Sequence, residues 1–355
     1  MRTTIPFAFQ LTACVLLALQ AVAAPTPHKH PAAHKHPSIG TKGTSQMAGA
    51  NLQFGQTYTY AYNGSLYNFT IVSAEYSSSV FNLSPTENQV ANDAQKLLII
   101  HFRFKNPNSQ DLYFADMPLF EAVDANGNTI KDIGASRRAG AKQVIGMEVK
   151  PGQGIDDLVT CIVIPTAGPV SKLILQMGRA GTSDTVTRFQ IGTPPNVIAP
   201  LAAPYADPSD KTGTTLASEI PSTVGTTYHA GGLDISLDNV KLEPGPIGDH
   251  TADDGKQFLV ATVTVTNKFM GQWYFSDGIK PILKTDEDKI TDCILLKGSH
   301  DTDFDGRTMD SGDTATQRIV LQVPKDATLK TLTLVNQMGN SGNYPGLVYD
   351  VSNLK

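Results

Sequence analysis

Short apolar runs separated by turn residues follow one another along most of the chain, and no window has the 3.6-residue period of an amphipathic helix. The strongest run, Lys96–Lys105, predicts a strand, and Phe258–Thr266 predicts its counterpart later in the chain. Further strands are predicted at Leu112–Phe114, Leu119–Val123, Val144–Val149, Leu158–Ile164, Leu173–Gln176, Trp273–Phe275, Ile282–Leu283, Arg318–Val323 and Thr331–Val335. Short strands at intervals of roughly 8–14 residues are typical of an antiparallel β-sandwich.

A β-hairpin is predicted near the start of this pattern. Three tyrosines alternate with smaller residues and lead into Asn63-Gly64, a pair that accepts the positive φ angles of a type I′ turn. A two-residue turn there pairs Tyr60 with Tyr67 and Tyr58 with Phe69. An exposed ladder of this kind could stack on sugar rings. Because Phe69 requires burial, we expect the ladder to belong to the core.

The second half of the chain repeats the first. Four residues recur 161 positions later, namely Asn106, Tyr113, Phe114 and Asp116 as Asn267, Tyr274, Phe275 and Asp277. Gln176-Met177-Gly178 recurs at the same offset. A fixed offset indicates tandem duplication of a whole domain. We therefore expect one sandwich at 51–192 and another at 225–355, joined by a Pro-rich, semi-extended linker at 193–224.

The repeated unit has a recognisable order of features. An early hairpin is followed by an apolar strand ending in Asn, a Tyr-Phe-x-Asp strand, a late strand closing on Pro, and a final strand near Gln-Met-Gly. This order resembles the telokin-like, immunoprotective-extracellular-type immunoglobulin-like modules of exported bacterial proteins, whose function is uncharacterised. The resemblance covers both copies. It implies an all-β fold of two tandem immunoglobulin-like antiparallel β-sandwiches and an exported location, and it carries over no site.

The N-terminus predicts export. Residues 1–23 have the pattern of a signal peptide, with Arg2, an apolar stretch at Ile5–Leu19 and the small residues Ala21-Val22-Ala23 before the expected cleavage. Residues 24–50 are rich in Pro, His, Lys and Ser and predict a disordered tether. We therefore expect a secreted or periplasmic protein. Because no later run of about 20 apolar residues occurs, no membrane span is expected.

Charge and cysteine content narrow the classes of partner. The formal net charge is −5, and neither repeat has the excess of Lys and Arg that phosphate-backbone binding requires. Nucleic acid is therefore not an expected partner, and an unidentified protein or cell-envelope component is. Beyond the signal, each repeat has one cysteine, Cys161 in the first and Cys293 in the second, at non-equivalent positions. No disulfide can therefore form within a repeat. Separate buried thiols are the preferred interpretation, with a bridge between repeats as the alternative.

One acidic loop has a spacing that suits a hard cation. Alternate carboxylates before a glycine let a tight loop direct several oxygens at one calcium ion. The candidate ligands are Asp301, Asp303, Asp305, Asp310 and Asp313. The match is incomplete because Gly312 occupies the position of the usual final Glu, and the other repeat has the basic pair Arg137-Arg138 at the corresponding place. A solvated acidic loop is the preferred interpretation, and calcium is the alternative cofactor.

A second candidate metal site is a duplicated His-Lys-His-Pro unit in the tether. It contains the imidazoles His28, His30, His34 and His36. Imidazole nitrogen is a good ligand for copper, zinc and nickel ions, so a loose chelating tail is chemically reasonable. A flexible, weakly basic tether is the preferred interpretation.

Recognisable catalytic motifs are missing from the sequence. It contains no Gly-x-Ser-x-Gly elbow, His-Glu-x-x-His, Cys-x-x-Cys or phosphate-binding Gly loop. His229 is expected to face Asp234 across the Gly231-Gly232 turn as a surface pair. We therefore expect a non-enzymatic binding or structural protein with an unknown ligand. The alternative is an extracytoplasmic protein that binds divalent metal at the aspartate loop or the His tract.

Overall fold

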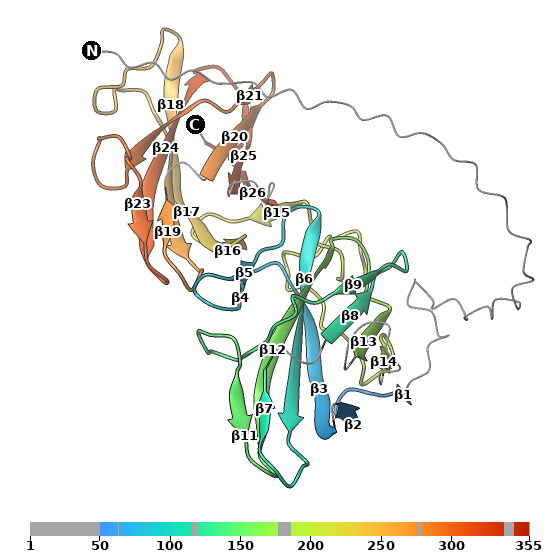
Figure 1. Cartoon of the computed structure of the whole chain (residues 1–355). Coiled ribbons are helices and arrows are strands. Elements are labelled where there is room, and N and C mark those ends of the chain that lie inside the picture. The colour runs from blue at the N-terminus through green and yellow to red at the C-terminus, as the bar shows by residue number, and fades with distance from the viewer. Residues whose placement is uncertain are drawn as a thin grey trace, which may run out of the picture. The chain divides into compact units, whose positions relative to one another are not determined.

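The computed structural model describes residues 50–62, 64–115, 119–176, 186–275, 279–336 and 344–354. All of them lie in one compact unit, and they form strands, turns and loops without a helix (Figure 1). The predicted all-β fold of two tandem immunoglobulin-like sandwiches is confirmed. The predicted signal peptide, residues 24–49 of the tether, Asp116, Asp277 and most of both Gln-Met-Gly segments lie outside the described residues.

The first module, residues 50–190, consists of two facing five-stranded sheets (Figure 1). One has the order β1 (Ala50–Asn51), β14 (Val186–Gln190), β13 (Lys172–Gln176), β8 (Leu119–Val123), β9 (Thr129–Lys131). The other has the order β10 (Arg137–Arg138), β12 (Gly154–Pro165), β6 (Gln95–Lys105), β3 (Ser65–Ser77), β2 (Thr57–Tyr62). A ribbon of β7 (Leu112–Phe114) and β11 (Met147–Val149) extends the sandwich.

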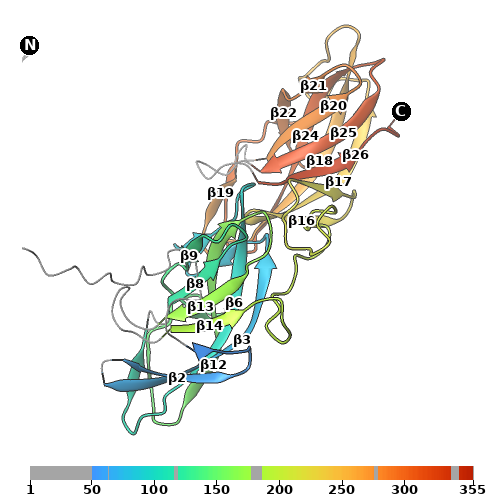
Figure 2. The same cartoon turned by 90° about the vertical axis from the view of Figure 1, so that its right-hand side faces the viewer.

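The second module, residues 219–350, has the same topology (Figure 2). One sheet has the order β15 (Glu219–Ser222), β26 (Gly346–Asp350), β25 (Leu329–Asn336), β20 (Ile279–Thr285), β21 (Lys289–Ile290). The other has the order β16 (Thr227–Ala230), β17 (Leu233–Glu243), β18 (Lys256–Asn267), β24 (Thr314–Pro324), β22 (Cys293–Lys297). A ribbon of β19 (Trp273–Phe275) and β23 (Arg307–Met309) corresponds to the β7–β11 ribbon. Because β15 pairs with β26, ordered structure of this module begins inside the segment predicted as linker.

The two modules fill the same backbone with different side chains. In the first, the predicted hairpin pairs Tyr60 with Tyr67 and Tyr58 with Phe69, and Tyr60 and Phe69 are buried as expected. Phe104 lies beside them, with its ring 4.5 Å from the ring of Phe114. In the second, the corresponding core residues are mostly aliphatic, namely Ala230, Leu233, Ile235, Val263 and Val265. An aromatic core and an aliphatic core therefore support one topology.

The repeated Asn residues hold the turn after the central strand of each module. Asn106 is fully buried, and its amide donates to the backbone oxygens of Gln110 and Val149 at 2.9 and 2.8 Å. Asn267 is equally buried, and its amide donates to Gly271 and Met309. A buried amide that satisfies loop carbonyls in this way explains why both copies have Asn here.

The adjacent repeated aromatic residues have opposite environments. Phe114 and Phe275 are buried, whereas Tyr113 and Tyr274 are 67% and 58% exposed.

The Pro-rich segment between the modules is packed and hydrogen-bonded rather than extended. Ala199 forms backbone hydrogen bonds with Ala74 and Tyr76 at the end of β3. The fully buried ammonium group of Lys96 donates to the carbonyl oxygens of Thr166, Gly168 and Thr214. Thr214 belongs to the segment, so Lys96 joins the segment to the first module.

A short hairpin of β4 (Phe81–Asn82) and β5 (Asn88–Gln89) has no counterpart among the described strands of the second module. The Asn82 amide donates to the carbonyl oxygen of Lys268 at 2.8 Å, and its side-chain oxygen accepts from the backbone N–H of Met270 at 3.1 Å. Arg137 donates to the Asn82 carbonyl and lies over the Phe81 ring. The Arg137 side chain therefore supports a contact between the modules.

Candidate functional site

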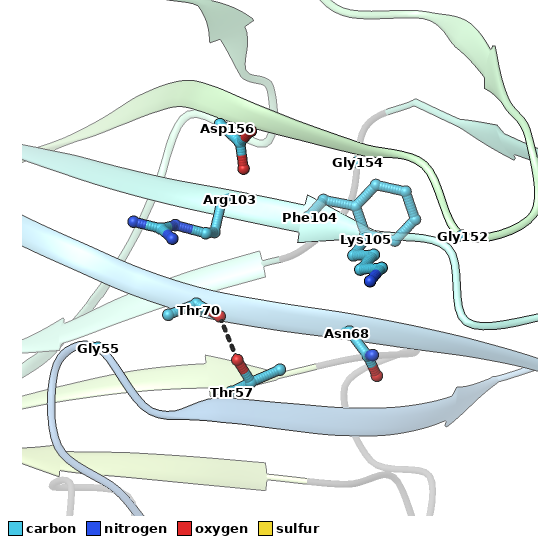
Figure 3. Close-up of a pocket in the computed structure, with 10 residues that line it drawn as sticks. All are labelled: Gly55, Thr57, Asn68, Thr70, Arg103, Phe104, Lys105, Gly152, Gly154 and Asp156. Atoms are coloured by element: carbon cyan, nitrogen blue, oxygen red, sulfur yellow. Dashed lines mark hydrogen bonds between the residues drawn. The ribbon is translucent and has the colours of Figure 1, made fainter.

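A polar groove of about 570 Å³ lies on the exposed face of the β10-β12-β6-β3-β2 sheet (Figure 3). Four strands and two turns of the first module supply its lining, which comprises Gly55, Thr57, Asn68, Thr70, Arg103, Phe104, Lys105, Gly152, Gly154 and Asp156. Its volume is within the range of small-molecule sites, but its lining is more polar than is usual for them. The groove therefore suits a polar ligand.

Strand register brings the lining residues into two rows across the sheet. Thr57 pairs with Thr70, and Thr70 pairs with Arg103. In the next row Lys105 lies between Asn68 and Gly154. Because side chains two residues apart on a strand point to the same face, Arg103 and Lys105 both project into the groove.

Glycine and a β-bulge shape the walls of the groove. Gly55 and Gly152 have φ angles of +85° and +74°, a backbone conformation that favours glycine in the turns that border the groove. At Gly154 a Cβ atom would lie 2.7 Å from the carbonyl oxygen of Phe104, so only glycine permits this close approach. The register shifts between Ile155 and Leu158, which places Asp156 in a bulge at the edge of the groove.

The charged groups of the groove are available to a ligand. Arg103, Lys105 and Asp156 are exposed, and none of the three makes an ion pair with another described residue. The polar neutral residues are held in place, because the Thr57 and Thr70 hydroxyls lie 2.7 Å apart and the Thr59 hydroxyl donates to Asn68 at 2.7 Å. The arrangement presents two cations, one carboxylate and fixed hydrogen-bonding groups on one face.

The same face of the second module has a different chemistry. Thr264 and Thr266 occupy the positions of Arg103 and Lys105, 161 residues later. Their hydroxyls lie 3.0 Å from those of Thr316 and Thr314 on β24. The hydroxyls of these threonines form hydrogen bonds with one another, so the fold does not require cations at these positions.

A second hollow, of about 680 Å³, lies in the second module around β21 and the start of β22. Lysines and carboxylates both line it, and Lys256 forms a 2.9 Å ion pair with Asp253 across it. The other charged lining residues are Asp288, Lys289 and Asp292, so this hollow is mainly acidic, whereas the groove of the first module offers two cations that have no ion-pair partner among the described residues.

The predicted calcium ligands do not converge. The structure gives each of the five carboxylates its own neighbour: Asp301 pairs with Arg318, Asp303 with His250 at 3.4 Å, Asp305 with Lys297 at 3.8 Å, Asp310 with Gln272 at 2.8 Å and Asp313 with Arg307 at 4.0 Å. The hydrogen bond from Arg318 holds the pKa of Asp301 below its usual value. Within the described residues no group of three or more His, Cys, Asp or Glu side chains is placed to hold a metal ion. The geometry therefore does not support calcium binding at this loop.

The remaining sequence candidates are placed as follows. His28, His30, His34 and His36 lie outside the described residues. Cys161 is buried in the first module and Cys293 is half-buried in the second, and they are not joined to each other.

The predicted pairing of His229 with Asp234 is confirmed, since the two face each other across the β16–β17 hairpin and share a hydrogen bond. Burial raises the pKa of Asp234, but hydrogen bonds from His229 and Lys268 outweigh it and hold that pKa below its usual value. The Tyr205 ring stacks on the imidazole. This cluster is a structural ion pair at the start of the second module.

Sequence reasoning missed Arg103 and Lys105 because they belong to a strand whose apolar residues dominate its pattern. A signal was nevertheless present. Two cations spaced by two residues lie on one face of a strand, and the aligned positions of the duplicate, Thr264 and Thr266, are neutral.

Comparison with known proteins finds one matching family model and several similar solved structures. A model described as a domain of unknown function, DUF4352, matches residues 222–344, which is the second module. No curated protein matches. An uncharacterised β-sandwich protein from Clostridium difficile 630 is similar at 14% identity and a TM-score of 0.29, over 38% of this chain and 94% of that one.

The secreted protein MPT63 from Mycobacterium tuberculosis is similar at 15% identity and a TM-score of 0.29, over 40% of this chain and 98% of that one. A secreted serine protease, VesC from Vibrio cholerae, has 12% identity and a TM-score of 0.15, over 71% of this chain and 49% of that one. Among the described residues no helix is long and apolar enough to cross a membrane.

Proposed function

We propose that the protein is an exported, non-catalytic binding protein and that the groove of the first module is its ligand site. The observation that carries this proposal is a groove of about 570 Å³ whose charged side chains form no ion pair with any residue that the structure describes. Exposed charges held on a rigid sheet suit recognition, because the sheet fixes their spacing before a ligand arrives. Charge pairs that stabilise a fold are satisfied internally, and these are not.

The composition of the groove supports binding rather than catalysis. Its lining offers hydroxyl, amide, guanidinium, ammonium and carboxylate groups, but it includes no His or Cys. Nucleophilic catalysis requires an activated nucleophile within hydrogen-bond reach of a base, and the Thr57 and Thr70 hydroxyls contact each other instead. The export part of the proposal is supported by Arg2 and the apolar stretch that follows it.

A groove-blocking variant tests the proposal. In Thr57→Trp a large ring replaces a small exposed side chain at the groove, whereas Thr227→Trp makes the same change at the equivalent position of β16 in the second module. Trp is a good strand former, so neither change should unfold its sheet. The full chain is applied to arrays of cell-envelope polymers and soluble glycans. We expect binding that Thr57→Trp abolishes and Thr227→Trp preserves; equal binding by both variants would refute the groove as the site.

A further inference from the structure

We infer that the groove of the first module recognises a hydroxylated organic anion, namely a sugar unit that carries a carboxylate or a phosphate. This inference rests on the proposed function and specifies its ligand class. The groove combines the two kinds of group that such a molecule requires, cations for its acid group and fixed polar side chains for its hydroxyls. Neither kind alone distinguishes an acidic sugar from a simple anion or a neutral sugar.

The two cations of the groove lie on one strand, and each is open to an acid group of a ligand. Arg103 and Lys105 are two residues apart on β6 and project from the same face (Figure 3). Guanidinium binds carboxylate or phosphate through two parallel hydrogen bonds, and ammonium adds a point charge with three donors. Because neither side chain has an ion-pair partner among the described residues, a ligand does not have to displace a carboxylate to reach them.

The other lining residues suit hydroxyl groups. Asp156 at the bulge is a free acceptor, and carboxylates accept hydrogen bonds from sugar hydroxyls readily. Its charge also disfavours a ligand that is anionic along its whole length, because that end of the groove would repel it. On the opposite side Asn68 offers both a donor and an acceptor, and its orientation is set by the Thr59 hydroxyl. The groove therefore favours one acid group beside several hydroxyls.

The second module shows that this chemistry is not a requirement of the fold. Its matching strand has Thr264 and Thr266 in place of the two cations, and its sheet has the same order of strands. Asp234 and His229 occupy the row that Asn68 and Thr59 occupy in the first module. A shared scaffold with different charges at one face is expected where only one copy has taken on a ligand.

Isothermal titration of the full chain tests the inference, with four probes. Galacturonate and galactose 6-phosphate supply hydroxyls with one carboxylate or one phosphate, galactose supplies hydroxyls alone, and tricarballylate supplies carboxylates alone. The key variant is Arg103→Thr/Lys105→Thr, which introduces the residues of the second module. Lys280→Thr/Lys330→Thr removes the same charge from two exposed positions outside the groove.

We expect galacturonate or galactose 6-phosphate to bind, and the stronger of the two identifies the acid group. Affinity should fall with added salt and at least roughly tenfold in Arg103→Thr/Lys105→Thr, while Lys280→Thr/Lys330→Thr binds like the unmodified chain. Galactose and tricarballylate should bind at least roughly tenfold more weakly than the acidic sugar.

Two results would overturn the inference while leaving the proposed function intact. One is a neutral ligand whose binding Thr57→Trp blocks but Arg103→Thr/Lys105→Thr does not. The other is equal affinity for tricarballylate and the acidic sugars. If Thr57→Trp leaves all binding unchanged, the proposed function itself fails. Thermal unfolding of each variant confirms that the compared proteins are folded.

Discussion

The two modules present the same sheet to solvent with different chemistry. In the first, β6 carries Arg103 and Lys105, which have no ion-pair partner in the described part of the chain, whereas in the second, β18 carries Thr264 and Thr266 with their hydroxyls beside those of neighbouring threonines. Strand order is unchanged, but the register differs at β12, where the first module has the bulge that carries Asp156 and the equivalent pair β18–β24 has none. Because the outward positions of a strand contribute little to the core, duplication left them free to differ. The contrast separates what the fold requires from what a function adds.

The cores give the complementary lesson. Phe102 and Phe104 of the first module correspond to Val263 and Val265 of the second, and all four are buried. Larger rings on one strand require neighbours of matching shape, which the first module supplies through Tyr60 and its hairpin. The alternation of buried and exposed positions therefore specifies the topology, and the side chains that fill the core are adjusted afterwards.

The largest expected effect on the free energy of unfolding comes from truncating a core side chain in each module. Phe104 contacts three buried rings and corresponds to Val265. We expect Phe104→Ala to lower the free energy of unfolding of the first module by about 4 kcal/mol, and Val265→Ala to lower that of the second by about 2 kcal/mol, because the larger ring leaves the larger cavity.

Urea unfolding measures both changes. Trp273 is the single tryptophan and lies in the second module, so its fluorescence reports that module, while tyrosine emission and circular dichroism report both modules together. Phe104→Leu, which removes less volume, serves as the graded control. Equal losses for Phe104→Ala and Val265→Ala would show that the aromatic core is no better packed than the aliphatic one.

A pH-dependent difference between the modules is expected from Lys96, whose counterpart is Gln257. Burial lowers the Lys96 pKa from 10.5 to about 8, and nearby Asp210 only partly offsets this. Between these values the unfolded chain holds a proton that the folded chain has released. The contribution of Lys96 to the free energy of unfolding of the first module should therefore rise with pH from about 8 toward about 10.5, by at most about 1.4 kcal/mol per pH unit, and it is read as the difference from a variant without Lys96.

Lys96→Gln supplies the matched control, because it introduces the residue of the second module. Urea unfolding of both proteins is measured from about pH 7.5 to about pH 9.5. This pH range lies below the ordinary pKa of tyrosine, so ionisation of Tyr76, which lies beside the Lys96 ammonium group, contributes little to the slope. A rise of the same slope in Lys96→Gln would contradict the assignment to Lys96.

The sequence predicted the scaffold more completely than the site. Tyr60–Tyr67 pairing and the strands at Lys96–Lys105 and Phe258–Thr266 follow from alternation and turn chemistry, which are local. Of Val144–Val149 only Met147–Val149 forms a strand.

The groove and the packed linker could not be predicted, because both depend on contacts between residues distant in sequence. Thr57 and Arg103 line the same groove only because each pairs with Thr70 on the strand between them. In the linker, the Lys96 ammonium group donates to the carbonyl oxygen of Thr214, which is distant in sequence. The ion pairs of the aspartate loop could not be predicted for the same reason. The sequence shows its carboxylates but not the Arg318 and Lys297 side chains that pair with Asp301 and Asp305.

The smallest expected effect concerns the β4–β5 hairpin, which has no counterpart among the described strands of the second module. Asn82 makes two hydrogen bonds to the Lys268–Met270 turn, and Asn82→Ala removes both. Because a hydrogen bond at a partly exposed site contributes about 0.5–1.5 kcal/mol, we expect the free energy of unfolding reported by Trp273 to fall by about 1 kcal/mol. Asn88→Ala, at the exposed partner position of the same hairpin, should change it by less than about 0.5 kcal/mol. If Asn82→Ala and Asn88→Ala have equal effects, the hairpin does not stabilise the second module, and the modules differ in this insertion without consequence for stability.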